Sequence, residues 1–158
     1  MRVGLGFDTH GFDSARPLVL GGVTIPDAPG LAGHSDGDAL CHAIADALLG
    51  AARLGDLGER WPSTEQWRGA ASVELLEETM QLLRRAGWRI ANIDSTVVAE
   101  RPRLAPHRQA MVDRIARSLE IEPGAVSVKS TTTDGLGFTG RSEGIAAYAV
   151  VLISKVDE

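Results

Sequence analysis

Residues 34–55, HSDGDALCHAIADALLGAARLG, contain the clearest helical pattern of the chain. Apolar residues recur there at the three- and four-residue spacing of one helix face: Leu40, Ala43, Ile44, Ala47 and Leu48. Ser35 is typical of a helix N-cap, and Asp36 and Asp38 in the first turn suit the positive end of the helix dipole. The pattern predicts a helix that begins after Ser35 and packs on a core.

Short runs of β-prone residues lie before this helix. Residues 3–7 are predicted to form a strand that ends in the polar sequence Asp8-Thr9-His10. A second strand is expected over residues 18–20, and it continues over residues 23–25 after a pair of glycines. Residues 26–33 are rich in glycine and proline, which predicts a loop.

The chain beyond the helix alternates irregularly between helical and strand patterns. Residues 55–69 are predicted to be irregular and are a candidate mobile loop, and residues 72–85 have the pattern of an amphipathic helix that ends before Gly87. Further strands are predicted over residues 93–99, 126–132 and 145–154, a third helix over residues 106–119, and a glycine-rich link over residues 134–144. This mixture predicts an α+β fold, with a mixed four-stranded sheet and helices on one face.

Length, composition and charge narrow the class of protein. The 158 residues suit a single catalytic domain, and 44% hydrophobic with 23% charged residues is typical of a soluble globular protein. A formal net charge of −5 argues against nucleic acid or an anionic membrane as a partner. Cys41 is the only cysteine, which excludes a disulfide framework and favours a reducing compartment. Without a signal-peptide core or a run of about 20 apolar residues, a cytoplasmic location is expected.

Asp8, His10 and His42 are the candidate metal ligands. Side chains two residues apart leave a strand on the same face, so the Asp8 carboxylate and the His10 imidazole can converge. His42 lies in the helix with Asp38 and Asp46 four residues to either side, which predicts a polar stripe. Two imidazoles and a carboxylate suit zinc with an open fourth position, although iron(II) uses the same set. Asp38 and Asp46 are expected to support the ligands or to contact substrate hydroxyls.

Simpler interpretations of these residues remain open. An Asp-x-His sequence is common by chance, and His42 could be a hydrogen-bonded histidine on a helix surface. His34 and Ser35 precede a helix N-terminus that favours an anion, but Ser35 could be only a cap and His34 only solvated. A structural zinc site normally has four protein ligands, so three candidates disfavour a non-catalytic zinc or nucleotide module. A zinc phosphoesterase acting on a nucleotide diphosphate is a further alternative.

A polyanion-binding patch is the remaining possibility. Arg101, Arg103, His107 and Arg108 are few, and no aromatic residues are interleaved with them. Because the chain is also net acidic, this interpretation is disfavoured. Arg103 is better interpreted as one side of a nucleotide site.

Three segments resemble a known family. GFDTH at 6–10, HSDGDALCHAIADALLGAARLGDLG at 34–58 and KSTTTDGLGFTGRSEGIA at 129–146 closely resemble 2-C-methyl-D-erythritol 2,4-cyclodiphosphate synthases of the non-mevalonate isoprenoid pathway. The resemblance implies that Asp8, His10 and His42 bind zinc. It also implies an intramolecular ring closure in which 4-diphosphocytidyl-2-C-methyl-D-erythritol 2-phosphate releases CMP.

The resemblance also assigns roles to other residues. His34 and Ser35 would meet the phosphate end of the substrate, with Asp46, Asp56 and Gly58 on its methylerythritol part. The implied nucleotide-binding residues are Ala99, Arg103, Leu104, Ala105, Ser130, Thr131 and Thr132. Thr132 and Asp134 would lie at the diphosphate and, with His34, act in catalysis.

Two positions depart from the family pattern. Asp134 stands where a glutamate usually binds a second divalent metal, magnesium or manganese, and its side chain is one methylene shorter than that of glutamate. Ser63 stands where many relatives have an aspartate that contacts substrate hydroxyls, so that role is not carried over.

The family also implies an assembly. Its members are homotrimers whose sheets face the trimer axis and whose active sites lie between subunits. Metal ligands would come from one chain and part of the nucleotide pocket from its neighbour. Phe138, Arg141 and Glu143 match residues that line a central cavity; the alternative is a loop aromatic in the core and a surface ion pair.

Overall fold

The computed structural model describes residues 1–156, and its strands form a single mixed sheet in the order β2-β1-β5-β3-β4. The strands are β1 (Arg2–Leu20), β2 (Val23–Leu31), β3 (Trp88–Val98), β4 (Val126–Thr131) and β5 (Gly144–Lys155). Only β3 and β4 pair in parallel; the other pairs are antiparallel. The predicted α+β class with a mixed sheet is confirmed, but the sheet has five strands and not four.

β2 arises only partly from residues that were expected to be a loop: residues 23–25 were predicted as strand, and residues 26–31 extend it. β1 is long because residues 2–11 pair with β5 while residues 12–13 and 17–20 pair with β2, so the strands predicted at 3–7 and 18–20 are one strand. The prediction of a loop over residues 26–33 is wrong for most of its length, since β2 runs to Leu31. Its prolines are tolerated because β2 is an edge strand, where a missing N–H leaves no neighbour unbonded.

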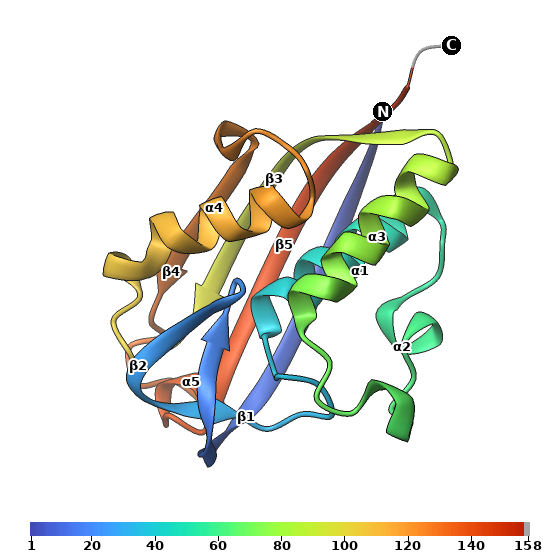
Figure 1. The fold of residues 1–158 in the computed structure, drawn as a ribbon. Coiled ribbons are helices and arrows are strands. Elements are labelled where there is room, and N and C mark those ends of the chain that lie inside the picture. The colour runs from blue at the N-terminus through green and yellow to red at the C-terminus, as the bar shows by residue number, and fades with distance from the viewer. Residues whose placement is uncertain (157–158) are drawn as a thin grey trace.

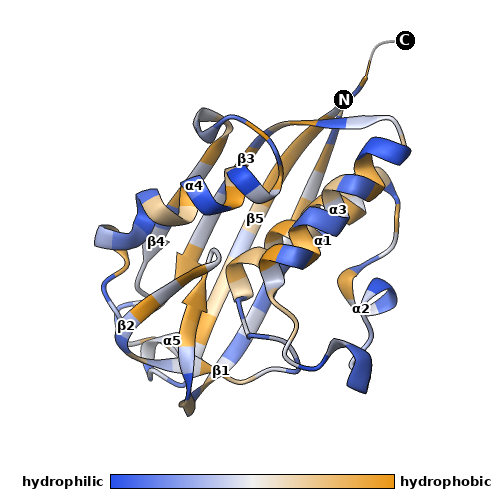
Figure 2. Cartoon of the chain, viewed as in Figure 1, coloured by the Kyte–Doolittle hydropathy of each residue, from blue (hydrophilic) through white to orange (hydrophobic). Residues whose placement is uncertain are grey.

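The helices α1, α3 and α4 lie on one side of the sheet (Figure 1). The helices are α1 (Ala39–Ala52), α2 (Leu57–Arg60), α3 (Ser72–Arg85), α4 (Arg108–Ser118) and α5 (Gly137–Gly140), with 3₁₀ turns η1 (Glu65–Trp67), η2 (Ala105–His107) and η3 (Pro123–Ala125). Helix α1 is almost wholly buried, whereas α3 and α4 present polar outer faces (Figure 2). None of the helices within residues 1–156 is long and apolar enough to cross a membrane.

Helix α1 starts later than the sequence predicted, and Ser35 is not its cap. Asp38 is the N-cap: its carboxylate accepts hydrogen bonds from the backbone N–H groups of Cys41 at 3.0 Å, Gly21 at 2.9 Å and Gly22 at 2.7 Å. The expectation that Asp38 supports metal ligands or contacts substrate is therefore wrong. Its carboxylate is fully buried and bonded to the β1–β2 turn and to its own helix.

Two glycines of β1 allow α1 to lie directly on the sheet. A Cβ atom on Gly4 would lie 2.0 Å from the Ala47 carbonyl oxygen, and one on Gly6 would lie 1.9 Å from the Ala43 carbonyl oxygen. Only glycine fits such a close approach of two backbones. The same contact brings the next residues of β1, Asp8 onward, beside the first turn of α1.

Candidate metal centre and active site

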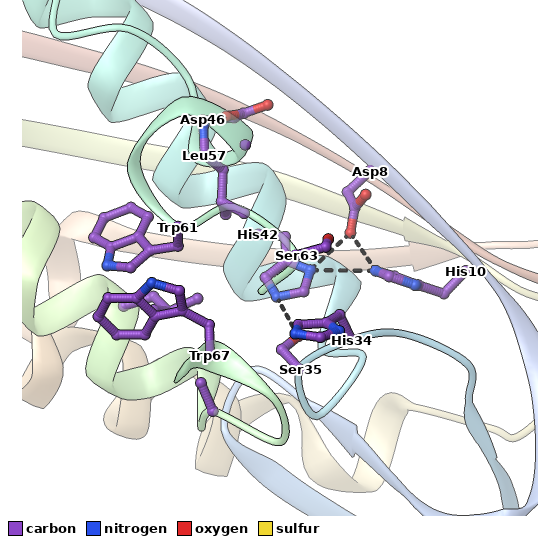
Figure 3. Close-up of a pocket in the computed structure, with 13 residues that line it drawn as sticks. Asp8, His10, His34, Ser35, His42, Asp46, Leu57, Trp61, Ser63 and Trp67 are labelled. Atoms are coloured by element: carbon purple, nitrogen blue, oxygen red, sulfur yellow. Dashed lines mark hydrogen bonds and ion pairs between the residues drawn. The ribbon is translucent and has the colours of Figure 1, made fainter. Parts of the chain in front are cut away.

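Asp8, His10 and His42 converge at one point between β1 and α1 (Figure 3). Asp8 Oδ2 lies 2.8 Å from His10 Nε2 and 3.0 Å from His42 Nδ1. The two imidazole nitrogens are themselves 3.2 Å apart. One ligand atom from each residue lies within 4.8 Å of the others, so the predicted convergence is confirmed. That the group binds metal stays a prediction.

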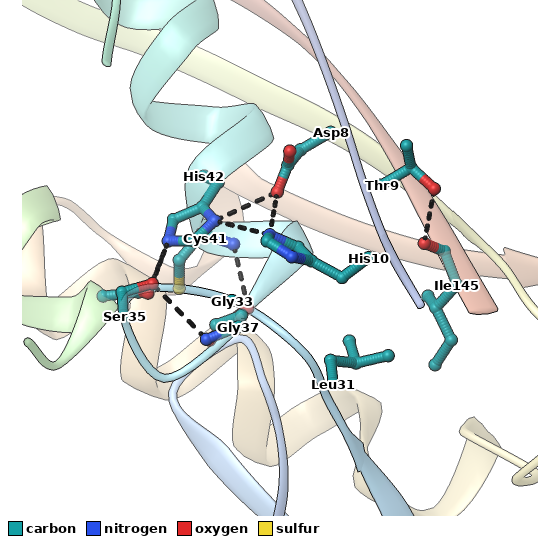
Figure 4. A network of polar contacts seen from close by, with 12 residues as sticks. Asp8, Thr9, His10, Leu31, Gly33, Ser35, Gly37, Cys41, His42 and Ile145 are labelled. Atoms are coloured by element: carbon teal, nitrogen blue, oxygen red, sulfur yellow. Dashed lines mark hydrogen bonds and ion pairs between the residues drawn. The ribbon is translucent and has the colours of Figure 1, made fainter. Parts of the chain in front are cut away.

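The outer nitrogens of both histidines have hydrogen-bond acceptors. His10 Nδ1 lies 2.5 Å from the Ala32 carbonyl oxygen, and His42 Nε2 lies 2.9 Å from the Ser72 hydroxyl. His42 Nε2 also lies 3.1 Å from the Ser35 hydroxyl (Figure 4). A carbonyl can only accept, so Nδ1 of His10 carries a proton, and its Nε2 can give a lone pair to a cation in place of the bond to Asp8. This is how metal-binding histidines are held, so the donor set fits a cation.

The charge of Asp8 also suits a cation. Burial by itself raises the pKa of Asp8, but hydrogen bonds from His10 and His42 outweigh burial and lower the pKa from 3.8 to about 2. Asp8 is therefore ionised at neutral pH. The pKa of His10 is raised, because the bond and charge of Asp8 outweigh the lowering effect of burial.

The cluster opens into a pocket of about 270 Å³. Its walls include His34, Ser35, Asp46 and Gly58, as the resemblance implied, and also Ser63. Its other wall is apolar and was missed by the sequence argument: Leu57, Trp61, Trp67, Ala70 and Leu75. Two tryptophans in the predicted irregular segment were the available signal. That segment contains α2 and η1, so it is partly helical.

Three of the predicted substrate contacts, Asp46, Asp56 and His34, also make bonds that hold the fold together. The Asp46 carboxylate accepts a hydrogen bond from the Leu57 N–H at 2.7 Å, which ties α2 to α1. Asp56 caps α2 by accepting from the Glu59 N–H at 2.8 Å and does not line the pocket. The His34 imidazole contacts the Thr64 carbonyl oxygen, which joins the loop before α1 to the segment before η1.

A second depression, of about 370 Å³, lies at the ends of β3 and β4. Every residue that the resemblance assigned to the nucleotide lines it, together with Glu100 and Pro102: Ala99, Arg103, Leu104, Ala105, Ser130, Thr131 and Thr132. They gather because β3 and β4 are parallel neighbours, which places the loops that follow them at the same edge.

Glu100 shapes the loop that carries Asp134. Its Oε1 accepts hydrogen bonds from the Thr133 N–H at 2.9 Å and the Gly135 N–H at 3.4 Å. Asp134 has a φ of 51°, and its carboxylate accepts a bond from the Thr132 hydroxyl at 3.1 Å. Glu100 was missed, although a lone acid within AERPRLA was visible at residues 99–105.

The two depressions lie at the same end of the sheet but apart. Thr9, Ala146, Val98 and Thr131 form one row across β1, β5, β3 and β4. Three strand spacings separate its ends, which is about 14 Å. Within the described residues, the two depressions share no lining residue.

Phe138 lies in α5, and Arg141 and Glu143 follow it before β5; the Glu143 N–H donates to the Phe138 carbonyl oxygen at 2.9 Å. The side chain of Phe138 is 38% exposed, so it is not a core aromatic. Arg141 Nε donates to Glu143 Oε1 at 2.7 Å in an exposed ion pair. Their predicted place in a central cavity depends on an assembly and stays a prediction.

Comparisons with known proteins agree on one family. The model of the YgbB family matches residues 1–154. A 2-C-methyl-D-erythritol 2,4-cyclodiphosphate synthase from Syntrophomonas wolfei is 58% identical over 156 residues, or 98% of this chain and 99% of that protein. A CDP-bound 2C-methyl-D-erythritol-2,4-cyclodiphosphate synthase structure has a TM-score of 0.88 at 38% identity, over 97% of this chain and 100% of that chain. The CDP complex of IspF from Plasmodium falciparum has a TM-score of 0.87 at 31% identity, over 99% and 97%.

Proposed function

The chain belongs to the YgbB family of 2-C-methyl-D-erythritol 2,4-cyclodiphosphate synthases, and we propose that its ring closure takes place on zinc held by Asp8, His10 and His42. The reaction converts 4-diphosphocytidyl-2-C-methyl-D-erythritol 2-phosphate to the 2,4-cyclodiphosphate and CMP in the non-mevalonate isoprenoid pathway. The observation that carries the zinc proposal is the convergence of the three ligand atoms beside the pocket. Zinc is favoured because the three ligands leave a position for substrate.

The chemistry needs positioning more than a protein nucleophile. An oxygen of the 2-phosphate attacks the β-phosphorus, and the bond from that phosphorus to the CMP oxygen breaks. A phosphate with a second pKa of about 6 is already largely dianionic at neutral pH, so no side chain has to activate it. When bound, zinc and the second divalent metal would polarise the phosphorus and neutralise the diphosphate.

Side chains on both sides of the diphosphate would do the remaining work. His34 and Ser35 would donate to a phosphate oxygen, and the hydroxyls of Thr131 and Thr132 would add donors at the nucleotide end. The apolar wall around Trp61 and Trp67 would exclude water from the reacting groups. Asp46, Asp56 and Gly58 would hold the methylerythritol part.

The oxygen balance separates this reaction from its nearest rival. If the protein closes a ring, turnover in ¹⁸O-labelled water is expected to give CMP and a cyclic diphosphate without the label. A zinc phosphoesterase would place one labelled oxygen on a phosphate product. Mass spectrometry of the products measures the difference, and label at a phosphorus in the first-formed product would overturn the ring closure.

Asp134 is the proposed ligand of magnesium or manganese. Asp134→Glu is expected to retain activity and to lower the magnesium concentration for half-maximal rate several-fold, because the longer arm reaches the metal directly. Asp134→Asn, which keeps a residue that tolerates positive φ, should raise that concentration. Initial rates against magnesium concentration test both variants. Complete loss of activity in Asp134→Glu would show that the site is matched to the shorter arm.

A homotrimer is the proposed assembly, and an uncovered apolar stripe supports it. Val3 and Leu5 on β1 are 68% and 70% exposed, and they leave the sheet on the face opposite α1. The other members of the stripe are Phe7, Tyr148 and Val150. An apolar stripe of this kind favours self-association. In the trimer, Phe138, Arg141 and Glu143 would line the central cavity.

The remaining proposals follow from composition. We propose one catalytic domain over residues 1–158, which acts on a small molecule and not on nucleic acid or a membrane, in keeping with the net charge of −5. The single cysteine, Cys41, is buried and free, which favours the cytoplasm as the compartment.

A further inference from the structure

The Ser72 hydroxyl lies between His42, a proposed metal ligand, and the Asp36 carboxylate. Ser72 is the first residue of α3, and its side chain is fully buried. Its Oγ lies 2.9 Å from His42 Nε2 and donates a short hydrogen bond to Asp36 Oδ1. Asp36 Oδ2 accepts a second bond from the Ser72 N–H at 2.8 Å. Asp36 therefore fixes both the backbone and the hydroxyl of Ser72.

The direction of these bonds determines which nitrogen of His42 faces the metal site. A carboxylate only accepts, so the Ser72 hydroxyl donates its hydrogen bond to Asp36, and its oxygen lone pairs face His42. The Ser72 oxygen can then only accept from His42, which favours a proton on Nε2. With that proton held, Nδ1, which lies 3.0 Å from Asp8 Oδ2, can give its lone pair to a metal in place of its hydrogen bond to Asp8.

Ser35 offers His42 a second acceptor, but of a different kind. Its hydroxyl is 3.1 Å from His42 Nε2, yet the residue lines the pocket and is only partly buried. In the proposed reaction Ser35 meets the substrate phosphate, which would draw its hydroxyl away from His42. Ser72 lies behind the pocket wall and is not among the lining residues, so substrate leaves its bond unchanged.

We propose that Asp36 and Ser72 form a positioning pair that holds His42 with Nδ1 presented to the metal, whether or not Ser35 is engaged by substrate. This inference rests on the proposed zinc site. The alternative is that Asp36 only caps α3, because the N-cap residue Ala71 makes no side-chain capping bond. The two roles use different atoms: the cap uses the Ser72 N–H, and the positioning uses the Ser72 hydroxyl.

Ser72→Ala separates the two roles, because it deletes the hydroxyl and keeps the backbone N–H. We expect its zinc dissociation constant, measured by chelator competition, to rise about 10- to 100-fold, as is typical when a partner of a metal-binding histidine is lost. Ser72→Thr retains the hydroxyl and should restore most of the affinity. Ser95→Ala is the matched control, since Ser95 is also buried and bonded, at 2.8 Å to the Ser127 carbonyl oxygen, far from the site.

A second measurement does not depend on metal. In the zinc-free protein, ¹⁵N chemical shifts of the His42 ring should report a protonated Nε2 in the unmodified chain. In Ser72→Ala, a larger share of the rings should carry a proton on Nδ1 alone, donated to Asp8. If the alanine variant does not fold, Ser72→Cys keeps the size with a weak acceptor and carries the same test. A zinc affinity of Ser72→Ala within twofold of the unmodified chain, while His42→Ala loses zinc, would overturn the pair alone. Zinc binding that survives in His42→Ala would overturn the proposed metal site itself.

Discussion

Replacing His42 with alanine is expected to remove the bound metal and to abolish CMP release. The substitution leaves only Asp8 and His10, which are two ligands on one strand, and it opens the side of the cluster that α1 closes. Removal of a single charge-stabilising donor from an active site already costs 10²- to 10³-fold, so we expect a loss of at least about a thousandfold. Metal analysis of the purified variant and quantification of CMP measure the two effects separately.

The control for this variant is another histidine outside the cluster. His107 lies in η2, and His107→Ala should retain the metal content of the unmodified chain. Circular dichroism and thermal melting establish that His42→Ala is folded; alanine is the best helix former, so α1 should persist. A variant that has lost its metal but keeps full activity would end the metal mechanism. One that keeps its metal would end the ligand assignment.

The sequence predicted those parts of the site that depend on local spacing. Asp8 and His10 are two residues apart on a strand, and this alone places both side chains on one face. The position of His42 within a helix followed from the apolar spacing around it. No local rule brings α1 against β1, but the glycines at 4 and 6 were visible signs of a close approach.

The parts that were predicted wrongly depend on contacts between distant residues. Ser35 is a residue type that often caps helices, yet Asp38 caps α1. The Gly21 and Gly22 amides also need an acceptor at that position, and the Asp38 carboxylate provides it. Residues 26–31 have the composition of a loop, yet they belong to β2, and residues 29–31 pair with β1 at the edge of the sheet. Ser72 lies 30 residues from His42, and only the packing of α3 on α1 brings its hydroxyl to the imidazole. Composition cannot report any of these partners.

The residues assigned to the nucleotide could not be predicted from the sequence pattern alone. Their grouping followed from the family resemblance, since nothing in the pattern of residues 99–105 and 130–132 specifies cytidine. The structure explains why they gather: both segments follow parallel neighbouring strands. It also leaves them about three strand spacings, roughly 14 Å, from the Asp8, His10 and His42 cluster of the same chain. That separation would give the proposed trimer a function in catalysis, because a neighbouring chain could bring the two halves together.

Two inactive variants are therefore expected to restore activity when they are mixed. His42→Ala removes the metal half, and the double variant Thr132→Ala with Asp134→Asn removes the nucleotide half. If each active site joins the metal half of one chain to the nucleotide half of the next, some sites of a mixed trimer have both halves intact. Random assembly of equal amounts gives three mixed trimers in four with one intact site in three, so about a quarter of the sites should work. Coexpression followed by a CMP-release assay measures this recovery.

The recovery shows whether the active site is shared between chains, and the activity of purified mixed assemblies shows how many subunits share it. A site contained within one chain gives no recovery, since every chain carries one of the two lesions. A cyclic trimer predicts about a quarter of the activity of the unmodified enzyme per site, whereas a symmetric dimer with two shared sites predicts the same overall fraction from half-active dimers. Purifying mixed assemblies through a tag on one variant and a second tag on the other resolves these two cases. Doubly tagged dimers would have one working site in two, and doubly tagged trimers one in three, so the activity per chain of the purified species reports both the sharing of the site and the number of subunits.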